Sequence, residues 1–150
     1  MEILIYSIEK VKDGFTDDID RYIKMSKNYA SIKEYNFFNN KIAKAQSKSK
    51  EESLRAYDEI YESKIDGFSV GLDERGEMLD SLEFADLIAG KNKVSFFIGG
   101  PYGLSNDFKN KVDRVISLSR LTFAHKIAKL VLYEQIFRAL TINANHPYHK

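Results

Sequence analysis

The residues best suited to chemistry begin at a glycine-rich stretch, Gly99-Gly100-Pro101-Tyr102-Gly103. It directly follows Val94-Ser95-Phe96-Phe97-Ile98, an apolar run typical of a strand covered on both faces. Open α/β sheets bind ligands at the carboxyl ends of their strands, where glycine lets the backbone approach a ligand closely. The spacing is not the dinucleotide fingerprint, and Pro101 lacks an N–H that a phosphate cradle would use. The stretch predicts either a loop that holds a nucleoside or amino-acid group, or a tight turn without a ligand.

A second loop of this kind is predicted after Val115-Ile116-Ser117-Leu118-Ser119, which has the composition of a brief strand. The loop is Arg120-Leu121-Thr122-Phe123-Ala124, at that strand's carboxyl end. A short helix capped by Ser105 or Asn106 separates it from the first loop. Loops at the same edge of a parallel sheet lie close together, so we expect the two loops to form the walls of one pocket.

All three histidines follow these loops, at positions 125, 146 and 149. His146 and His149 are spaced like metal ligands, but no third ligand stands at a recognisable spacing, so no metal site is predicted. Pro147 favours an extended tail over a helix. The candidates for handling a proton are Tyr148, His149 and Lys150 in the tail and His125 beside the second loop, and the sequence does not rank them.

The elements that must position these residues alternate between strands and helices. Residues 3–8, 32–38 and 68–72 read as further strands, and the residues between them have helical periodicity. Asp73-Glu74-Arg75-Gly76-Glu77 is expected to be a polar turn whose carboxylates cap rather than catalyse. The fold class is therefore α/β, a mostly parallel sheet flanked by helices, in a single domain over residues 1–150.

The last predicted helix, from Lys126 to about Asn143, is apolar on most of its circumference. Such a helix must be buried on two sides, and we expect one side to face the sheet and the other a second subunit or a groove. Glu134 and Arg138 are spaced to form an ion pair within it.

Composition and charge limit the classes of protein to which the chain can belong. A chain of 150 residues without cysteine can bury a real core, has no thiol chemistry and fits a reducing cytoplasm. Residues 1–8 are too short and acidic for a signal peptide, and no run is long enough to span a membrane. Net charge is only +1, yet residues 51–90 carry three basic against twelve acidic residues and residues 91–150 carry ten against three. The basic part would suit an RNA backbone, although solvated surface is the plainer interpretation, as it is for the lysines of residues 40–50.

Three ordered motifs resemble one family over essentially the whole chain: residues 97–104 (FIGGPYGL), residues 117–125 (SLSRLTFAH) and residues 145–149 (NHPYH) followed by a basic residue. The family is the ribosomal large-subunit pseudouridine methyltransferase H family of the SPOUT superfamily. Some members carry proline at positions 124 and 126, so the second loop of this chain departs from the family pattern there. Lys150 stands where some members have arginine, so a role for this residue carries over from the family less directly.

The resemblance implies a SPOUT-type fold with a C-terminal trefoil knot, a homodimer, and methylation of N3 of a pseudouridine in large-subunit (23S) ribosomal RNA. It implies that S-adenosylmethionine binds at Leu72 and the two loops, and that the tail acts in RNA binding or catalysis. The cofactor residues carried over by motif are Leu72, Gly99, Gly100, Gly103, Ser119, Arg120, Leu121, Thr122, Phe123 and Ala124. The expected partner is ribosomal RNA within the ribosome, in the cytoplasm, with no DNA and no membrane.

Two other functions fit the same residues. The chain could methylate another rRNA or tRNA position, although the tail motif favours the pseudouridine. It could also be a dimeric RNA-binding or ribosome-assembly protein without catalysis, which loss of cofactor binding would reveal.

Overall fold

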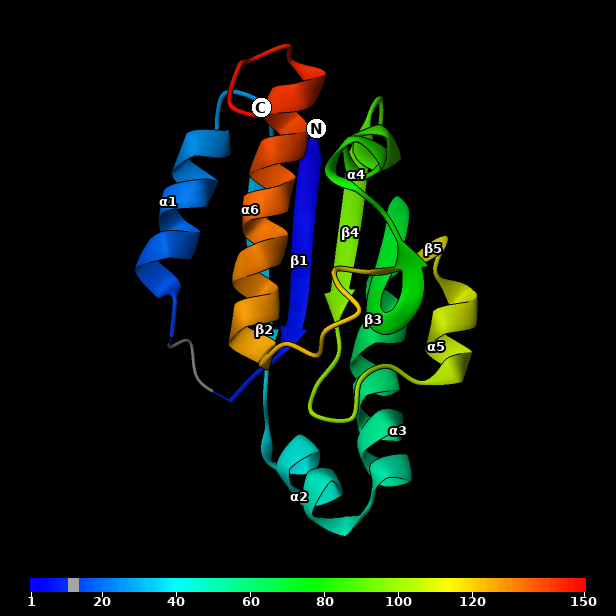
Figure 1. The fold of residues 1–150 in the computed structure, drawn as a ribbon. Helices are drawn as coiled ribbons and strands as arrows, with labels where there is room; N and C mark the ends of the chain where they lie inside the picture. The colour runs from blue at the N-terminus through cyan, green and yellow to red at the C-terminus, as the bar shows by residue number, and fades with distance from the viewer. Residues whose placement is uncertain (11–13) are drawn as a thin grey trace.

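The computed structural model describes residues 1–10 and 14–150, which form a five-stranded sheet flanked by helices (Figure 1). All the strand pairs are parallel, and the strand order is β2-β1-β4-β3-β5. The strands are β1 (Glu2–Ile8), β2 (Ser31–Phe37), β3 (Phe68–Met78), β4 (Lys93–Ile98) and β5 (Arg114–Ser117). The predicted α/β class with a parallel sheet is confirmed.

Helices cover both faces of this sheet because its inner strands are apolar on both faces. Ile3 and Ile5 of β1 pack in the cluster beneath one set of helices, whereas Leu4 and Tyr6 pack in the other cluster. The first set is α1 (Thr16–Ser26), α4 (Ser81–Ile88) and α6 (His125–Asn143). The second set is α2 (Asn40–Lys48), α3 (Lys50–Tyr61), which continues into the short 3₁₀ helix η1 (Glu62–Lys64), and α5 (Asn106–Lys111).

Side-chain caps fix where several helices begin. Ser105 accepts a hydrogen bond from the Phe108 N–H at 3.0 Å, as one of the two predicted caps of α5. Asp80 and Glu83 form a reciprocal capping box at the start of α4. Of the lysine-rich residues 40–50, residues 40–48 form a helix of their own, α2, which Asn39 caps by accepting the Ile42 N–H, and Lys50 begins α3. This part of the chain is therefore helical surface and not a linker.

The predicted polar turn at Asp73–Glu77 is wrong as an end to the strand. β3 continues to Met78, with a register shift between Leu72 and Glu77, and pairs again with β5. Gly76 makes this possible, since a Cβ there would lie 2.6 Å from the backbone carbon of Ile116. The polar composition of the segment hid a strand that continues through a register shift against β5.

Helix α6 lies over the sheet between α1 and α4, which cover its two flanks (Figure 1). α1 and α4 thus cover part of the apolar circumference of α6 within one chain, and the second subunit expected on its other side stays a prediction. From β5, at the sheet edge, the chain returns to α6 through a loop in which Thr122 donates a hydrogen bond to Glu74 at 2.7 Å. This return path is consistent with the trefoil knot.

Candidate active site

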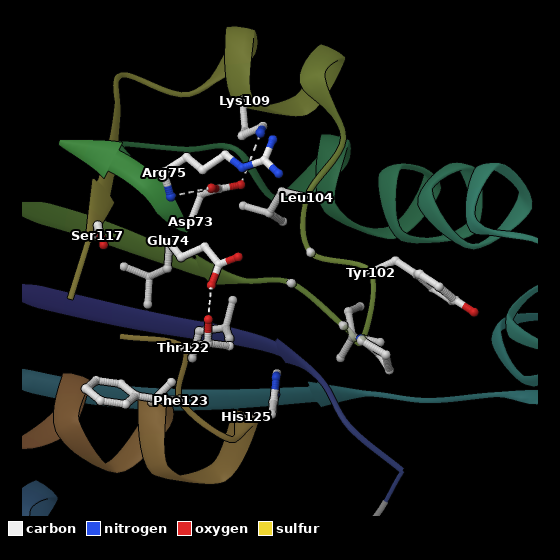
Figure 2. Close-up of a pocket in the computed structure, with 18 of the residues that line it drawn as sticks. Asp73, Glu74, Arg75, Tyr102, Leu104, Lys109, Ser117, Thr122, Phe123 and His125 are labelled. Atoms are coloured by element: carbon white, nitrogen blue, oxygen red, sulfur yellow. Dashed lines mark hydrogen bonds and ion pairs between the residues drawn. The ribbon is translucent and has the colours of Figure 1, made fainter. Parts of the chain in front are cut away.

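A pocket of about 930 Å³ opens at the carboxyl ends of four neighbouring strands. Ile8, Leu72, Ile98 and Ser117, near the ends of the paired segments of β1, β3, β4 and β5, all line it. The two predicted loops form its walls, as the sequence indicated, and Figure 2 shows the side chains that surround the space. This is the position at which open parallel sheets bind ligands.

The first loop, residues 99–103, is held from behind by α3. The Tyr61 hydroxyl donates to the Ile98 carbonyl at 2.6 Å, and a Cβ on Gly100 would lie 2.6 Å from the Tyr57 hydroxyl oxygen. The loop closes with a hydrogen bond from the Gly103 N–H to the Gly100 carbonyl at 2.9 Å. Gly103 has a φ of 76°, which favours glycine, and, its chain neighbours aside, no atom of the described residues lies within 4 Å of where its Cβ would stand. The glycines therefore set the loop's shape and leave its backbone open to the pocket.

Charged side chains line the opposite wall (Figure 2). Lys109 Nζ lies 3.0 Å from Asp73 Oδ2, and Asp73 Oδ1 accepts the Arg75 N–H at 2.8 Å. Burial raises the pKa of Asp73, but the hydrogen bonds from Arg75 and Lys109 outweigh it, so that the pKa is lowered overall. The wall therefore presents fixed negative and positive groups that can pair with a zwitterionic ligand.

The second loop, residues 118–124, begins with a serine turn. Leu121 N–H donates to Ser119 Oγ at 2.9 Å, and Ser117 Oγ donates to the Ser119 carbonyl at 2.8 Å. Leu121 is 71% exposed, the most of any large apolar side chain described. A large apolar side chain so exposed is suited to contact a ligand or a partner.

Most of the cofactor residues predicted from the sequence meet in this pocket. Those that line it are Leu72, Gly99, Gly100, Gly103, Ser119, Leu121, Thr122 and Phe123. Arg120 and Ala124 belong to the same loop but do not line the pocket. His125, the residue after the loop, also lines it.

The tail residues lie elsewhere. Tyr148, His149 and Lys150 follow the far end of α6, and Figure 1 shows the C-terminus at the opposite end of the helix from the two loops. Tyr148 donates to Glu134 Oε1 at 3.1 Å, and Arg138 lies over the Tyr148 ring at 4.8 Å and 3.1 Å from His149 Nδ1. Glu134, Arg138, Tyr148 and His149 are called the tail cluster below. The predicted Glu134–Arg138 pair is confirmed at 2.6 Å.

The state of the tyrosine in the tail cluster limits what it can do. Burial, together with the neighbouring Glu134 carboxylate, raises the pKa of Tyr148. Its hydroxyl therefore keeps its proton near neutral pH and acts as a donor. Of the predicted proton-handling residues, Tyr148 is thus suited to donate a hydrogen bond and not to accept a proton.

A set of buried polar residues beside the pocket escaped the sequence analysis. Lys129 of α6 contacts Glu9, just after β1, and Glu34 and Asn36 of β2, while His125 lies beside Glu9. One signal was available, because Lys129 is a cation within a helix that is otherwise mostly apolar. Its partners lie more than 90 residues away in sequence, so no spacing could identify them.

Two further observations concern the residues that the structure describes. None of their helices is long and apolar enough to cross a membrane. Nor do the described side chains include a group of three or more histidines and acids that could hold a metal ion.

Comparison with known proteins first identifies the class of protein to which the chain belongs. The family described as "Predicted SPOUT methyltransferase" matches residues 1–149, and the chain belongs to it. A solved structure titled as a tRNA (m1G37) methyltransferase from Aquifex aeolicus is similar in fold, with a TM-score of 0.57 and 16% identity over 100% of this chain and 74% of that chain.

Within that class the chain belongs to the ribosomal RNA large-subunit methyltransferase H family. It is 60% identical to the protein of that name from Campylobacter fetus subsp. fetus, with 100% of both chains covered. It is 50% identical to the protein of the same name from Aliarcobacter butzleri, again with 100% of each covered. The resemblance seen in the three sequence motifs is confirmed.

Proposed function

We propose that this protein transfers a methyl group from S-adenosylmethionine to N3 of a pseudouridine in large-subunit ribosomal RNA, in the cytoplasm. The observation that carries the proposal is the pocket between the two loops at the carboxyl ends of the strands, in a chain of an rRNA methyltransferase family. Positioning the nucleophilic nitrogen against an activated methyl group is the main task of such a site, and one proton must also be removed.

The pocket fits S-adenosylmethionine in size and chemistry. Its volume of about 930 Å³ suits a ligand of nucleoside size with room for a base. The residues that would hold the cofactor are Leu72, the two loops and the charged wall with Asp73 and Lys109. When bound, the cofactor supplies a methyl group activated by a sulfonium. The loops contribute open backbone, and the charged wall can pair with both the amino and the carboxylate group.

The RNA would approach at the same end of the molecule, where exposed lysines extend the pocket mouth. Lys50, at the start of α3, lines the pocket, and α2 ends two residues before it. Lys44 and Lys48 of α2 are exposed and have no salt bridge among the described residues. Replacing both with glutamine should reduce the slope of log binding constant against log salt by about two, uniformly for different RNA sequences. An unchanged slope in a filter-binding assay would remove α2 from the RNA surface.

We further propose a homodimer in which the tail of one copy acts at the pocket of the other. Within one chain the tail is held against α6, away from the pocket. Several large apolar side chains stay exposed on segments around the start of α6 and of α4, as expected for an interface. They are Met78, Leu82, Leu121 and Ile127.

Calorimetric titration with S-adenosylmethionine tests the cofactor. Gly100→Val is a poor variant for blocking the pocket, because the added Cβ would collide with Tyr57 in the core. Thr122→Trp instead fills the pocket from an exposed wall position, and Lys27→Trp, exposed at the end of α1, is the matched control. We expect binding by the wild type and the control but not by Thr122→Trp. A folded wild type that does not bind would contradict the proposal and favour the non-catalytic RNA-binding role.

Mass spectrometry of the methylated nucleoside tests the target. We expect the label from the methyl donor to appear on N3 of a pseudouridine in large ribosomal subunits that lack the modification. Label on another nucleoside, or on tRNA, would still show that the protein transfers methyl groups, but it would contradict the proposed pseudouridine target.

A further inference from the structure

Five side chains form a buried polar cluster beside the pocket: Glu9, Glu34, His125, Lys129 and Tyr133. Lys129 Nζ lies 2.9 Å from Glu9 Oε2 and 2.6 Å from Glu34 Oε1, and these three side chains are only 4%, 9% and 8% exposed. Tyr133 donates to the other oxygen of Glu34 at 2.9 Å. The cluster joins α6 to the end of β1 and the middle of β2.

Stability alone is a weak reason for such a cluster. Removing charges from water costs several kcal/mol per ion, and well-packed apolar side chains often serve a core equally well. Burial raises the pKa of Glu9, but the hydrogen bond from Lys129 and the neighbouring His125 outweigh it and lower the pKa overall. The same balance, with Lys129 as the main partner, lowers the pKa of Glu34. Both carboxylates are therefore ionised near neutral pH, and one lysine serves both.

The second oxygen of Glu9 faces the pocket side of the cluster. Oε1 lies 3.4 Å from His125 Nε2, within ion-pair distance, and this buried nitrogen has no hydrogen bond among the described residues. His125 begins α6 and lines the pocket with its side chain 29% exposed. Figure 2 shows its ring projecting from the start of the helix beneath Thr122. The imidazole thus stands between a fixed carboxylate and the ligand space.

A carboxylate behind an imidazole is a known way to set which ring nitrogen carries the proton. With Nε2 protonated toward Glu9, Nδ1 keeps its lone pair. The imide N–H of a uracil-type base must lose its proton before or while the nitrogen forms a new bond. An imidazole nitrogen with a free lone pair can accept this proton, whereas the Tyr148 hydroxyl is a hydrogen-bond donor.

We propose that His125 is a catalytic residue that accepts the N3 proton, and that Glu9 is a positioning residue that holds the His125 ring through Nε2. In this step the N3–H bond breaks, the proton joins the imidazole, and N3 retains the electron pair that forms its bond to the methyl carbon. Lys129 anchors Glu9 from the core side. The inference rests on the proposed methyl transfer to N3.

The test is a double-mutant cycle in the dimeric protein, with large ribosomal subunits and labelled S-adenosylmethionine. Glu9→Gln keeps the shape of the side chain and removes the charge, and His125→Gln removes the base. Each single change should lower kcat by about a hundredfold and leave KM for the subunits and cofactor binding unchanged. The double variant should lose no more than His125→Gln, because Glu9 acts only through the histidine. Glu9→Asp should recover part of the rate.

The matched control is Glu2→Gln, at the opposite end of β1, where the carboxylate pairs with Lys33 and Lys93 away from the pocket. It should keep the wild-type kcat. Thermal unfolding verifies that each variant is folded, and Glu9→Asp with His125→Gln carries the test if Glu9→Gln does not fold.

The possible failures are distinguishable. An inactive wild type would overturn the proposed function and this inference with it. An active wild type together with an equally active Glu9→Gln or His125→Gln would overturn the inference alone. Losses that multiply in the double variant would show that Glu9 does not act through His125, and would overturn its positioning role.

Discussion

The buried polar cluster and the tail cluster are built from the same parts and are held in different ways. Each has a glutamate, a cation, a tyrosine and a histidine on or against α6. In the buried cluster, the partners of Lys129 are 93 to 122 residues away in sequence, whereas those of the tail cluster are 4 to 14 residues apart. Arg138 and Glu134 are 24% and 20% exposed, against 4% and 8% for Lys129 and Glu34.

This difference separates a fixed part of the site from a movable one. The buried cluster exists only when the sheet and α6 are assembled, so its opening requires much of the domain to unfold. The tail cluster involves only the end of one helix and the residues after it, and it can open while the domain stays folded. The structure therefore holds His125 in place and lets the tail leave α6 at low cost, which the proposed action of the tail on a second copy would require.

The largest expected effect distinguishes the two cations. Lys129→Met leaves the carboxylates of Glu9 and Glu34 buried without their cation, and should lower the free energy of unfolding by about 3–5 kcal/mol. Arg138→Met breaks a partly exposed pair and should cost about 1 kcal/mol or less. Urea unfolding at one protein concentration measures both values. Equal losses of unfolding free energy would show that Lys129 and Arg138 stabilise the protein to the same extent.

Removal of residues 145–150 should separate activity from stability. We expect the truncated protein to unfold within about 1 kcal/mol of the wild type, since its lost contacts are local and partly exposed. Its methyl transfer should fall by about a hundredfold or more if the tail holds the substrate at the reaction site. Steady-state kinetics and urea unfolding of the same preparation check both parts. A large loss of stability would contradict the view that the tail cluster is local.

Mixed dimers test where the tail acts. The truncated chain keeps an intact pocket, and Thr122→Trp keeps an intact tail with a filled pocket. Unfolding and refolding the two inactive variants together should restore activity if the tail of one copy serves the pocket of the other. No recovery, with mixed dimers verified by native mass spectrometry, would assign the tail to its own pocket or to neither.

Acid should affect the buried polar cluster through its carboxylates. The pKa values of Glu9 and Glu34 are lowered from 4.5, so their contribution to stability is present above that pH and is lost as the pH falls through the lowered values. In Lys129→Met the unpaired carboxylates gain from protonation instead. The difference in unfolding free energy between wild type and Lys129→Met should therefore shrink between pH 7 and about pH 4. A constant difference would mean that Lys129 contributes through packing and not through charge.

The sequence was sufficient for the parts of the site that follow local rules. A two-faced apolar strand followed by glycines predicts a loop at the ligand edge, and Ser105 had the expected capping role. The two loops of the pocket were therefore identified as neighbours before the structure showed it. Motif resemblance identified the family, because three ordered segments are far more specific than one glycine loop.

Other features depended on contacts that no local pattern records. The polar residues after Leu72 were interpreted as a turn that ends the strand, yet β3 continues and pairs with β5 again at Glu77 and Met78. The apolar circumference of α6 pointed to a second subunit or a groove, and the packing of α1 and α4 against α6 could not be read from local patterns. Glu9 and Lys129 were missed because their partnership exists only after α6 has returned across the sheet.

The smallest expected effect compares the two tyrosines. Tyr133→Phe removes a buried hydroxyl from Glu34, and should cost about 1.5–3 kcal/mol, as for hydrogen bonds to charged groups. Tyr148→Phe removes the matching bond to Glu134 at the partly exposed tail, where water can replace it, and should cost about 0.5 kcal/mol. The order should reverse for kcat, because the Tyr148 hydroxyl is proposed to hold the substrate and that of Tyr133 only braces Glu34. Urea unfolding and steady-state kinetics on the two variants decide the matter. If Tyr133→Phe proved the more harmful to kcat, the catalytic role would move from the tail to the buried polar cluster alone.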